Sequence, residues 1–550
     1  MGEALASKIT PPSDLTSIIN PPAICSTFFL SPITVNEFIK IISSLKNNTS
    51  NEPDGITTEI LKMFHMYLQG PLLYLINLIF STGIFPEIFK KSLVIPVYKS
   101  GSKKSVNNYR PITLTSNISK VIEKCINLRL NAYLQVNNIL SDSQFGFRQG
   151  LGTEDALVKV ADSLSHCMNE GRKCMMIFLD LTKAFDTVSH RILLDKLSRI
   201  GIRGVVGNFF KKYLDKRSQK VKIGEILSDS CQVGCGVPQG TVLGPILFSI
   251  FINDLIDFLR GDTVICYADD TVVIIEDKSW EMVYERAELV LQKLKLWFDC
   301  NLLTLNVNKS HFMCLSFNKR GLPERNELLI HNINCKKNTC NCSLKITSVP
   351  KYKYLGIYFD QHMRWSDHVE YLASKIRKMF FKFYQLRQWM PRCSVLNVYR
   401  SLAESVFNYG ISVWGAACGT ISIPALVAQK RLLKIILFKQ KTFSSELLYE
   451  EARVLSLKQL YIRSVSRLIL QEKYLLKKIA HEITTRAQKS SKVVTAYTPF
   501  SAIQRTLLFT APKIFNLLPQ NLKNMFGKKN YNKIKTDLTD WLITDRVNDY

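Results

Sequence analysis

The stretch Val264-Ile265-Cys266-Tyr267-Ala268-Asp269-Asp270-Thr271-Val272-Val273-Ile274-Ile275 places two adjacent carboxylates between two apolar runs rich in β-branched residues. Such runs favour strands and Asp favours turns, so the stretch predicts a hairpin with Asp269 and Asp270 at its turn. Adjacent carboxylates repel each other unless a cation neutralises them. Hard divalent ions prefer oxygen ligands, so we expect Mg²⁺ here, with Mn²⁺ as an alternative. An Asp-rich turn without a ligand remains the simpler interpretation of this stretch alone.

Length and charge narrow the class of protein. A chain of 550 residues is long enough for several subdomains. Its formal net charge of +28 predicts a polyanionic partner, with nucleic acid first and an acidic membrane surface a distant second. No apolar run approaches the ~18 residues of a membrane span, and no secretory signal is recognisable. Fourteen cysteines without an export signal indicate reduced thiols, so we expect an intracellular protein of the nucleus, the cytoplasm or both.

A third carboxylate follows another apolar run. Residues 174–179 are continuously apolar and are followed by Asp180, which is typical of a strand covered on both faces with a polar residue at its tip. Taken alone, Asp180 also fits an N-cap of the following helix. If this strand lies beside the hairpin, three carboxylates meet. Such a cluster holds two Mg²⁺ ions, of which one activates an attacking hydroxyl and the other stabilises a leaving pyrophosphate.

Two loops have the composition of phosphate-binding loops. A strand over 93–99, a basic loop and a returning strand over 109–114 place Lys99 and Arg110 near each other. Residues 234–240 are glycine-rich, which permits close approach of backbone to a ligand, and they precede a long apolar helix predicted over 242–259. Either loop alone is weak support for a ligand site, because basic loops are usually only solvated.

The remaining patterns predict mostly helices. We expect them over 35–45, 71–81, 118–134 and 282–298, and a strand interrupted by Gly356 over 352–359. Residues 321–345 are interpreted as a cysteine-bearing insertion. Its cluster lacks a paired C-x-x-C, which favours incidental thiols over a zinc site; the cysteines are Cys335, Cys340 and Cys342.

Helical periodicity and strong basic bias begin near residue 372. Apolar residues such as Leu372 and Ile376 mark one face, and lysines line the other. Between Lys375 and Lys439 there are eleven Lys or Arg and one acid, Glu404. We therefore predict a helical subdomain that lies along phosphates. The basic, mixed segment from about 480 has no assignment.

Together these motifs resemble those of reverse transcriptases from non-LTR retrotransposons, close to the jockey-like polymerases of insect mobile elements. The resemblance covers roughly residues 44–370 and rests on the order and spacing of several motifs. The matching segments are Lys99 with 108–112, 178–186, 236–240 with 243–245, 267–270, Asn306 with Lys309, and 354–356.

The resemblance implies an α+β fold of the right-hand polymerase type: fingers, a palm with an antiparallel sheet and a thumb, plus an α-helical basic C-terminal region. The expected divisions are a leader (1–53), fingers with an N-terminal extension (54–173), a palm (174–360), a helical basic thumb (361–480) and a C-terminal extension of unassigned role (481–550). The palm range includes part of the fingers, 191–230, and the cysteine-bearing insertion.

The resemblance also implies roles for single residues. The metal ligands would be Asp180, Asp269 and Asp270. These three residues would be catalytic together with Lys309, which is the candidate acid that protonates the pyrophosphate. The residues at the incoming nucleotide would be Lys99, Arg110, Leu181, Phe185, Gln239 and Gly240, of which Phe185 would block a ribose 2′-OH. The primer grip would be Tyr354, Leu355 and Gly356. The residues of the basic region that contact nucleic acid would be Lys375, Lys378 and Lys382.

The implied function is an RNA-directed DNA polymerase that uses dNTPs, an RNA template and a DNA primer, without a membrane partner. An RNA-dependent RNA polymerase has the same chemistry, but its gate position suits a polar residue that accepts the 2′-OH, so Phe185 disfavours it. A catalytically decayed nucleic-acid-binding relic is the alternative from another class. Complete elements of this type carry an endonuclease, and only about ninety residues precede the fingers strand here. We therefore expect a truncated element without DNA-nicking activity.

Overall fold

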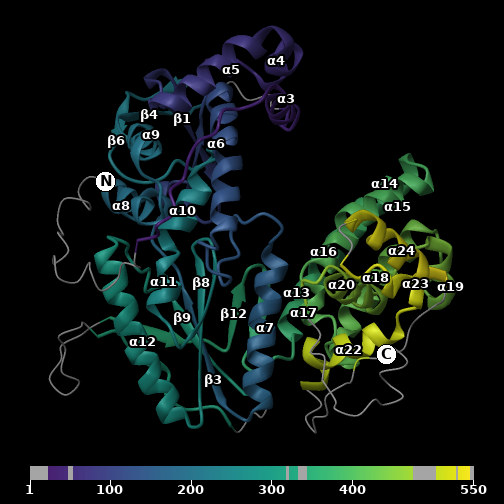
Figure 1. The fold of residues 1–550 in the computed structure, drawn as a ribbon. Coiled ribbons are helices and arrows are strands. Elements are labelled where there is room, and N and C mark those ends of the chain that lie inside the picture. The colour runs from purple at the N-terminus through teal and green to yellow at the C-terminus, as the bar shows by residue number, and fades with distance from the viewer. Residues whose placement is uncertain are drawn as a thin grey trace.

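The structure is a computed structural model that describes residues 23–47, 54–316, 321–331, 344–474, 493, 503–527 and 530–544. The expected leader before residue 23 and the cluster of Cys335, Cys340 and Cys342 lie outside the described residues. The described part is a mixed α+β structure, with strands in its N-terminal two thirds and helices alone after residue 360 (Figure 1). The α+β class predicted from the sequence is confirmed. None of the described helices is long and apolar enough to cross a membrane.

A six-stranded sheet forms the centre of the molecule. Its strand order is β10 (Glu327–Leu329), β11 (Lys345–Ser348), β9 (His311–Leu315), β3 (Lys173–Leu179), β8 (Asp270–Asp277) and β7 (Thr263–Tyr267). All neighbours are antiparallel except β11 and β9. The hairpin predicted around Asp269 is β7–β8, and β3 lies directly beside β8. Both predictions are therefore confirmed.

The side chains of β3 alternate between two hydrophobic cores. Met175, Ile177 and Leu179 are at most 3% exposed and pack into the core that includes α12 (Trp280–Cys300). On the opposite face, Cys174, Met176 and Phe178 are at most 1% exposed and share a core with α7 (Thr153–Asn169) and the C-terminal helices. Burial on both faces explains why this strand has a continuous apolar run.

A second sheet lies beside the first and is built from two separate parts of the chain (Figure 1). Its order is β2 (Tyr109–Leu114), β1 (Lys91–Tyr98), β4 (Arg217–Ile223) and β5 (Ile226–Leu227), and β6 (Cys231–Val233) also pairs with β4. The helices of this part are α3 (Val35–Ser43), α4 (Thr58–Met63), α5 (His65–Thr82), α6 (Asn117–Val136), α8 (His190–Arg199) and α9 (Gly204–Leu214). Its 3₁₀ turns are η1 (Glu87–Lys90), η2 (Val106–Asn108) and η3 (Ala184–Asp186). The helices predicted over 35–45, 71–81 and 118–134 correspond to α3, α5 and α6.

The helix expected over 242–259 is present as α10 (Gly244–Ile252) and α11 (Asp254–Phe258), which meet at Asn253 with a helical φ of −59°. Two expectations about single elements were wrong in detail. The strand expected over 352–359 is a hairpin of β12 (Lys351–Tyr354) and β13 (Ile357–Asp360), because Leu355 and Gly356 form its turn with φ of +42° and +84°. The described part of the insertion over 321–345 continues the central sheet, since β10 pairs with β11.

Helices alone make up the C-terminal part. They are α13 (Ser366–Arg377), α14 (Phe380–Trp389), α15 (Arg392–Tyr399), the π-helical turn η5 (Arg400–Glu404), α16 (Ser405–Asn408), α17 (Ile411–Trp414), α18 (Gly419–Ile436), α19 (Ser445–Ala452), α20 (Leu457–Leu470), the 3₁₀ turn η6 (Ile503–Arg505), α22 (Leu507–Leu517), α23 (Gln520–Lys523) and α24 (Tyr531–Thr544). α22 and α24 contact α20, and α22 also contacts α7. The buried side chains of α22 and Leu542 of α24 belong to the core of the preceding helices. Those of residues 518–538 form a smaller cluster around Leu470 of α20.

Candidate active site

The register of the central sheet places three carboxylates at one end. Leu179 pairs with Thr271, so Asp180, the next residue, faces Asp270 where β3 ends and β8 begins. Tyr267 pairs with Asp270, which leaves Ala268 and Asp269 as the two residues of the hairpin turn. Asp180 and the Asp269–Asp270 pair, about ninety positions apart in sequence, thus lie at the same edge of the sheet.

The three carboxylates affect one another electrostatically. Burial raises the pKa of Asp269, and the negative charge of Asp180 raises it further. Burial also raises the pKa of Asp270 to about 6, with contributions from Asp269 and Asp180. A divalent cation would relieve this repulsion, and carboxylate oxygens are the donors that Mg²⁺ prefers, so the donor chemistry fits that ion. Among the described residues, no group of three or more His, Cys, Asp and Glu side chains is placed so that it could hold a metal ion. The fit to Mg²⁺ therefore lies in the donor type and the excess negative charge.

Asp180 is held by the loop that precedes β9. The backbone N–H of Asn306 donates to the Asp180 carbonyl at 2.8 Å, and its side-chain amide donates to Asp180 Oδ2 at 3.0 Å. The backbone N–H of Asp180 donates to Ser310 Oγ at 3.1 Å. These bonds leave the other carboxylate oxygen, Oδ1, available to a ligand. Lys309 belongs to the same loop, but its exposed amine makes no ion pair with a described carboxylate.

Lys99 and Arg110 lie on one face of the β1–β2 ribbon. Arg110 pairs with Val97, and the N–H of Lys99 donates to the carbonyl of Asn108 at 2.9 Å. Residues two apart on a strand share a face, so this register brings the two cations together as predicted. The positive charges of Arg110 and Lys99 both lower the pKa of Asp269. The two cations therefore lie near the carboxylate edge.

The glycine-rich loop is held between β2 and the segment after β3. The N–H of Thr113 donates to the Gln239 carbonyl at 2.8 Å, and the N–H of Val237 donates to the Phe185 carbonyl at 2.8 Å. Gly240 has φ of +117°, and a Cβ there would lie 2.5 Å from the Thr113 carbonyl oxygen. Only glycine fits this close approach, so the loop places Gln239 and Gly240 beside Phe185.

Phe185 is fixed by other aromatic rings, whereas Leu181 belongs to the core. The Phe185 ring stacks on Phe248 with centroids 4.3 Å apart, and the edge of Phe147 meets it at 6.1 Å. Leu181 is 7% exposed and packs into the hydrophobic core. Of the two residues expected at the nucleotide, Phe185 is thus partly accessible and the Leu181 side chain is not.

The expected primer grip is the turn of the β12–β13 hairpin. Tyr354 is 3% exposed, and the carbonyl of Leu355 accepts a 2.6 Å hydrogen bond from the Tyr409 hydroxyl. The neighbouring Tyr352 stacks on Phe178 of β3 at 4.0 Å. Burial, followed by the charges of Asp180 and Asp270, raises the pKa of Tyr352 to about 12. The hairpin therefore lies next to the carboxylate edge.

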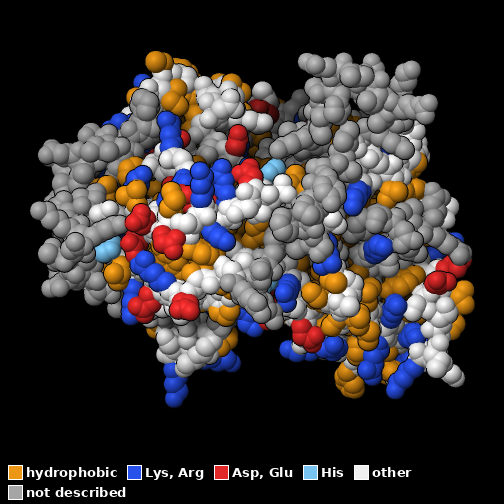
Figure 2. Space-filling view, turned by 90° about the horizontal axis from the view of Figure 1, so that it is seen from below, with side chains coloured by type: hydrophobic (Ala, Val, Ile, Leu, Met, Phe, Trp, Pro, Cys, Tyr) orange, Lys and Arg blue, Asp and Glu red, His pale blue; other side chains and the backbone are white. Residues whose placement is uncertain are grey.

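The lysines expected to contact nucleic acid lie on the helices that follow the β12–β13 hairpin. Lys375 on α13, Lys378 after it and Lys382 on α14 are all exposed, and α14 lies at the outer end of the helical part (Figure 1). Exposed aromatic side chains accompany them, namely Phe381 and Trp389. On the face drawn in Figure 2, Lys and Arg side chains occur over both parts of the molecule, with hydrophobic side chains among them in the right-hand part.

Gln144 supports the hairpin turn and was missed by the sequence reasoning. Its side chain is fully buried, and its Oε1 accepts hydrogen bonds from the N–H groups of Gly146 at 2.9 Å and Ala268 at 3.3 Å. A Cβ on Gly146 would lie 2.3 Å from the Ala268 nitrogen. The only sequence signal was the turn-rich composition of 144–148, which does not identify a partner.

Comparison with known proteins agrees with the motifs. The family model described as reverse transcriptase (RNA-dependent DNA polymerase) matches residues 101–359. The probable RNA-directed DNA polymerase from transposon BS of Drosophila melanogaster is 28% identical over 422 residues, which cover 74% of this chain and 45% of that protein. The RNA-directed DNA polymerase from mobile element jockey of the same species is 27% identical over 75% of this chain and 44% of its own length.

This chain thus spans less than half the length of these curated relatives. Among solved structures, a telomerase from Candida albicans covers 68% of each chain at 12% identity and a TM-score of 0.37. A TM-score of that size does not establish a shared fold. The family resemblance inferred from the motifs is confirmed by the sequence matches.

Proposed function

We propose that this chain, a reverse transcriptase related to the RNA-directed DNA polymerases of jockey-like non-LTR elements, is itself an active RNA-directed DNA polymerase. It would add nucleotides from dNTPs to the 3′-hydroxyl of a DNA primer on an RNA template. The observation that carries this proposal is the meeting of Asp180, Asp269 and Asp270 at one sheet edge near Lys99 and Arg110.

Each residue of the site has a proposed task. Bound at the three aspartates, Mg²⁺ would activate the primer hydroxyl and neutralise charge on the reacting phosphate. Asn306 and Ser310 keep Asp180 oriented through the hydrogen bonds given above. Lys99 and Arg110 would donate to the triphosphate, and Lys309 would give a proton to the leaving pyrophosphate. Phe185 would exclude a ribose 2′-OH, beside Gln239 and Gly240 at the base and sugar.

The right-hand division is proposed on the same basis. The β1–β2–β4 sheet with its helices would be the fingers, the six-stranded sheet the palm, and the helices from α13 onward the thumb. The turn of Tyr354, Leu355 and Gly356 would hold the primer end. Lys375, Lys378 and Lys382 would contact the phosphates of the template–primer duplex.

Primer extension on poly(rA)/oligo(dT) with Mg²⁺ tests the proposal. Asp269→Asn keeps the shape of the side chain and removes its charge. Asp229→Asn makes the same change at an exposed aspartate that is not among the site residues. We expect extension with dTTP, a loss of at least about two orders of magnitude in Asp269→Asn, and no change in the control.

Other outcomes of the same assay identify the alternatives. No extension by the wild type, with duplex binding intact and salt-sensitive, would replace the polymerase by a binding relic. Extension with UTP as efficient as with dTTP would favour an RNA-dependent RNA polymerase. Equal activity in Asp269→Asn and wild type would remove Asp269 from the catalytic set.

A further inference from the structure

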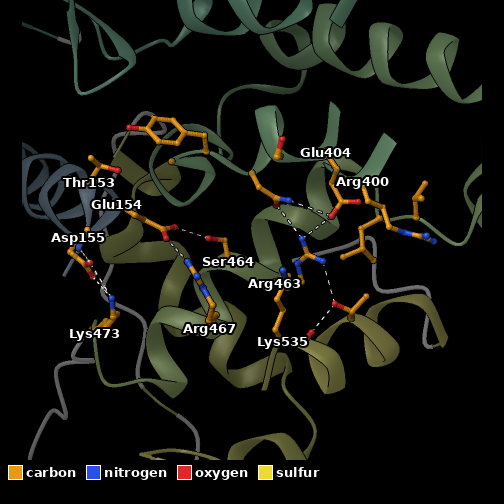
Figure 3. Close-up of a pocket in the computed structure, with 18 of the residues that line it drawn as sticks. Thr153, Glu154, Asp155, Arg400, Glu404, Arg463, Ser464, Arg467, Lys473 and Lys535 are labelled. Carbon is orange, nitrogen blue, oxygen red and sulfur yellow. Dashed lines mark hydrogen bonds and ion pairs between the residues drawn. The ribbon is translucent and has the colours of Figure 1, made fainter. Parts of the chain in front are cut away.

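A pocket of about 800 Å³ lies where the start of α7 meets the C-terminal helices (Figure 3). Its walls come from residues 150–155, from 400–410 around η5 and α16, from α20 and from α24. None of the residues placed at the carboxylate edge lines it. The pocket therefore needs an explanation of its own.

All three acidic residues of the pocket are already paired. Glu154 accepts hydrogen bonds from Ser412 and Ser464, each at 2.9 Å, and pairs with Arg467. Asp155 pairs with Lys473 at 3.0 Å. The Arg463 guanidinium, with 9% side-chain exposure, donates to Glu404 at 3.0 Å. Figure 3 shows these three pairs side by side along the wall. They leave no acidic side chain to repel an incoming anion.

Three further cations of the pocket have no acidic partner. Arg400, Arg453 and Lys535 are exposed, and among the described residues no carboxylate lies within ion-pair distance of them. Within the described part of the chain, Arg400 donates to the side chain of Asn397 and to the carbonyl of Arg453. The cations come from η5, from the loop after α19 and from α24. The pocket thus has an excess of three positive charges from three separate segments.

We propose that this pocket binds the phosphodiester backbone of a single strand of nucleic acid. Three cations on separate segments match successive phosphates of one chain better than a single compact anion. The volume is in the range of pockets that enclose one small ligand, so a few nucleotides of a strand fit and a duplex does not.

An aromatic side chain at the rim supports a strand as the ligand. Tyr409 lines the pocket and is 41% exposed, so its ring is accessible to a base. Its hydroxyl donates to the carbonyl of Leu355 in the β12–β13 turn. The pocket therefore adjoins the proposed primer grip. The inference that the bound strand continues from the primer grip rests on the proposed function. The inference that the pocket binds a strand does not.

The test compares two variants of the full chain that lose the same charge. The pocket variant carries Arg400→Gln, Arg453→Gln and Lys535→Gln, and the control carries Arg191→Gln, Lys212→Gln and Lys278→Gln at exposed positions elsewhere. Fluorescence anisotropy of a labelled single-stranded oligonucleotide is measured over a range of salt concentrations, with EDTA present. A second titration uses poly-glutamate as the ligand.

We expect the magnitude of the slope of log K against log salt to decrease by about 2 in the pocket variant, because each lost phosphate contact in a single strand contributes about 0.7. Extrapolated from 1 M salt, this corresponds to about a hundredfold weaker binding at 0.1 M. The control should keep the wild-type slope. Equal slopes in all three proteins would overturn the proposal. Loss of poly-glutamate binding with unchanged oligonucleotide binding would assign the pocket to an acidic polypeptide instead.

This result is separate from the outcome for polymerisation. EDTA removes metal-dependent chemistry, so strand affinity is measured whether or not the chain extends primers. A wild type that extends no primer, together with the expected loss of strand binding, would overturn the proposed polymerase and leave the pocket assignment standing. Primer extension by the wild type, with unchanged strand binding in the pocket variant, would overturn the pocket assignment and leave the proposed polymerase standing. Circular dichroism of both variants shows whether the chain is still folded.

Discussion

The side-chain amide of Gln239 donates a 2.9 Å hydrogen bond to the carboxylate of Asp186. Gln239 belongs to the glycine-rich loop, and Asp186 ends the 3₁₀ turn η3 (Ala184–Asp186) that contains Phe185. Burial raises the pKa of Asp186, while the hydrogen bond from Gln239 lowers it. The bond thus joins the two segments that would face the base and the sugar of an incoming nucleotide, although Asp186 itself was not predicted as a site residue.

Asp186→Ala is expected to raise the KM for dTTP about tenfold and to leave kcat nearly unchanged. The reason is that a hydrogen bond to an ionisable group contributes about 1.5 kcal/mol, and here it positions Gln239 before chemistry begins. Steady-state incorporation of a single nucleotide measures both constants. Asp186→Asn keeps an acceptor oxygen and should recover most of the affinity. Equal increases of KM in both variants would show that the charge of Asp186, rather than the orientation of Gln239, determines the affinity for dTTP.

Phe185→Val is expected to weaken the discrimination between dTTP and UTP. Phe185 stacks on Phe248, so its ring cannot move aside for a 2′-OH without losing that contact. A change in the size of such a pocket alters selectivity by about 1–3 kcal/mol, or about one to two orders of magnitude. The measurement is the ratio of kcat/KM for the two nucleotides. Phe29→Leu, which changes an exposed ring outside the site, serves as the control and should keep the wild-type ratio. Reduced use of dTTP without a gain for UTP would indicate damage to the fold.

Local patterns were sufficient for the elements that carry the carboxylates. The apolar run of β3 and the two β-branched runs around Asp269 determine strands through side-chain burial within each segment. Their pairing joins residues about ninety positions apart, and no local pattern encodes it. The order of the family motifs supplied that information.

The features missed depend on contacts between distant segments. Asn253, where α10 meets α11, accepts through its side chain from the N–H of Ser141 and donates to the carbonyl of Ile139, each at 2.9 Å. The β12–β13 turn requires positive φ at Leu355, which Leu rarely adopts, so only Gly356 signalled it. The pocket joins Glu154 to Arg467, more than three hundred positions later. Periodicity within a segment cannot reveal such partners.

The lysines of α13 and α14 are expected to contribute to duplex binding through charge alone. Lys375 lies 5.2 Å above the Tyr371 ring, and all three lysines are exposed. Replacing Lys375, Lys378 and Lys382 by Gln should reduce the salt slope for a template–primer duplex by about 2.7, since each phosphate contact contributes about 0.9. Anisotropy titrations with labelled duplex measure this slope.

The variant with Arg191→Gln, Lys212→Gln and Lys278→Gln is again the matched control. This control and the variant with Lys375→Gln, Lys378→Gln and Lys382→Gln lose the same charge. If both reduce the salt dependence of duplex binding equally, binding follows net charge and not the α13–α14 surface. If neither variant lowers the slope, these lysines are solvated and do not meet phosphates.

His368 is expected to make the junction between the β12–β13 hairpin and the C-terminal helices sensitive to acid. The ring is 1% exposed, and its Nδ1 accepts a 3.4 Å hydrogen bond from the Tyr358 N–H. Its Nε2 has no hydrogen-bond partner among the described residues. The ring also lies 5.4 Å from the Trp414 ring. Burial, followed by the charges of Lys353 and Lys375, lowers its pKa to about 4.

The direction of the effect follows from this lowered pKa. Below about 6.5 the unfolded chain binds a proton that the folded chain rejects, so stability present above that pH is lost as the pH falls toward 4. Each pH unit below 6.5 costs about 1.4 kcal/mol, so about 2 kcal/mol of the free energy of unfolding is lost between pH 7 and pH 5. His368→Gln keeps an acceptor for Tyr358 and does not titrate. The denaturant midpoint of the wild type should therefore fall more steeply with pH than that of the variant. Parallel curves over this range would show that His368 is protonated in the folded chain or is accessible to water.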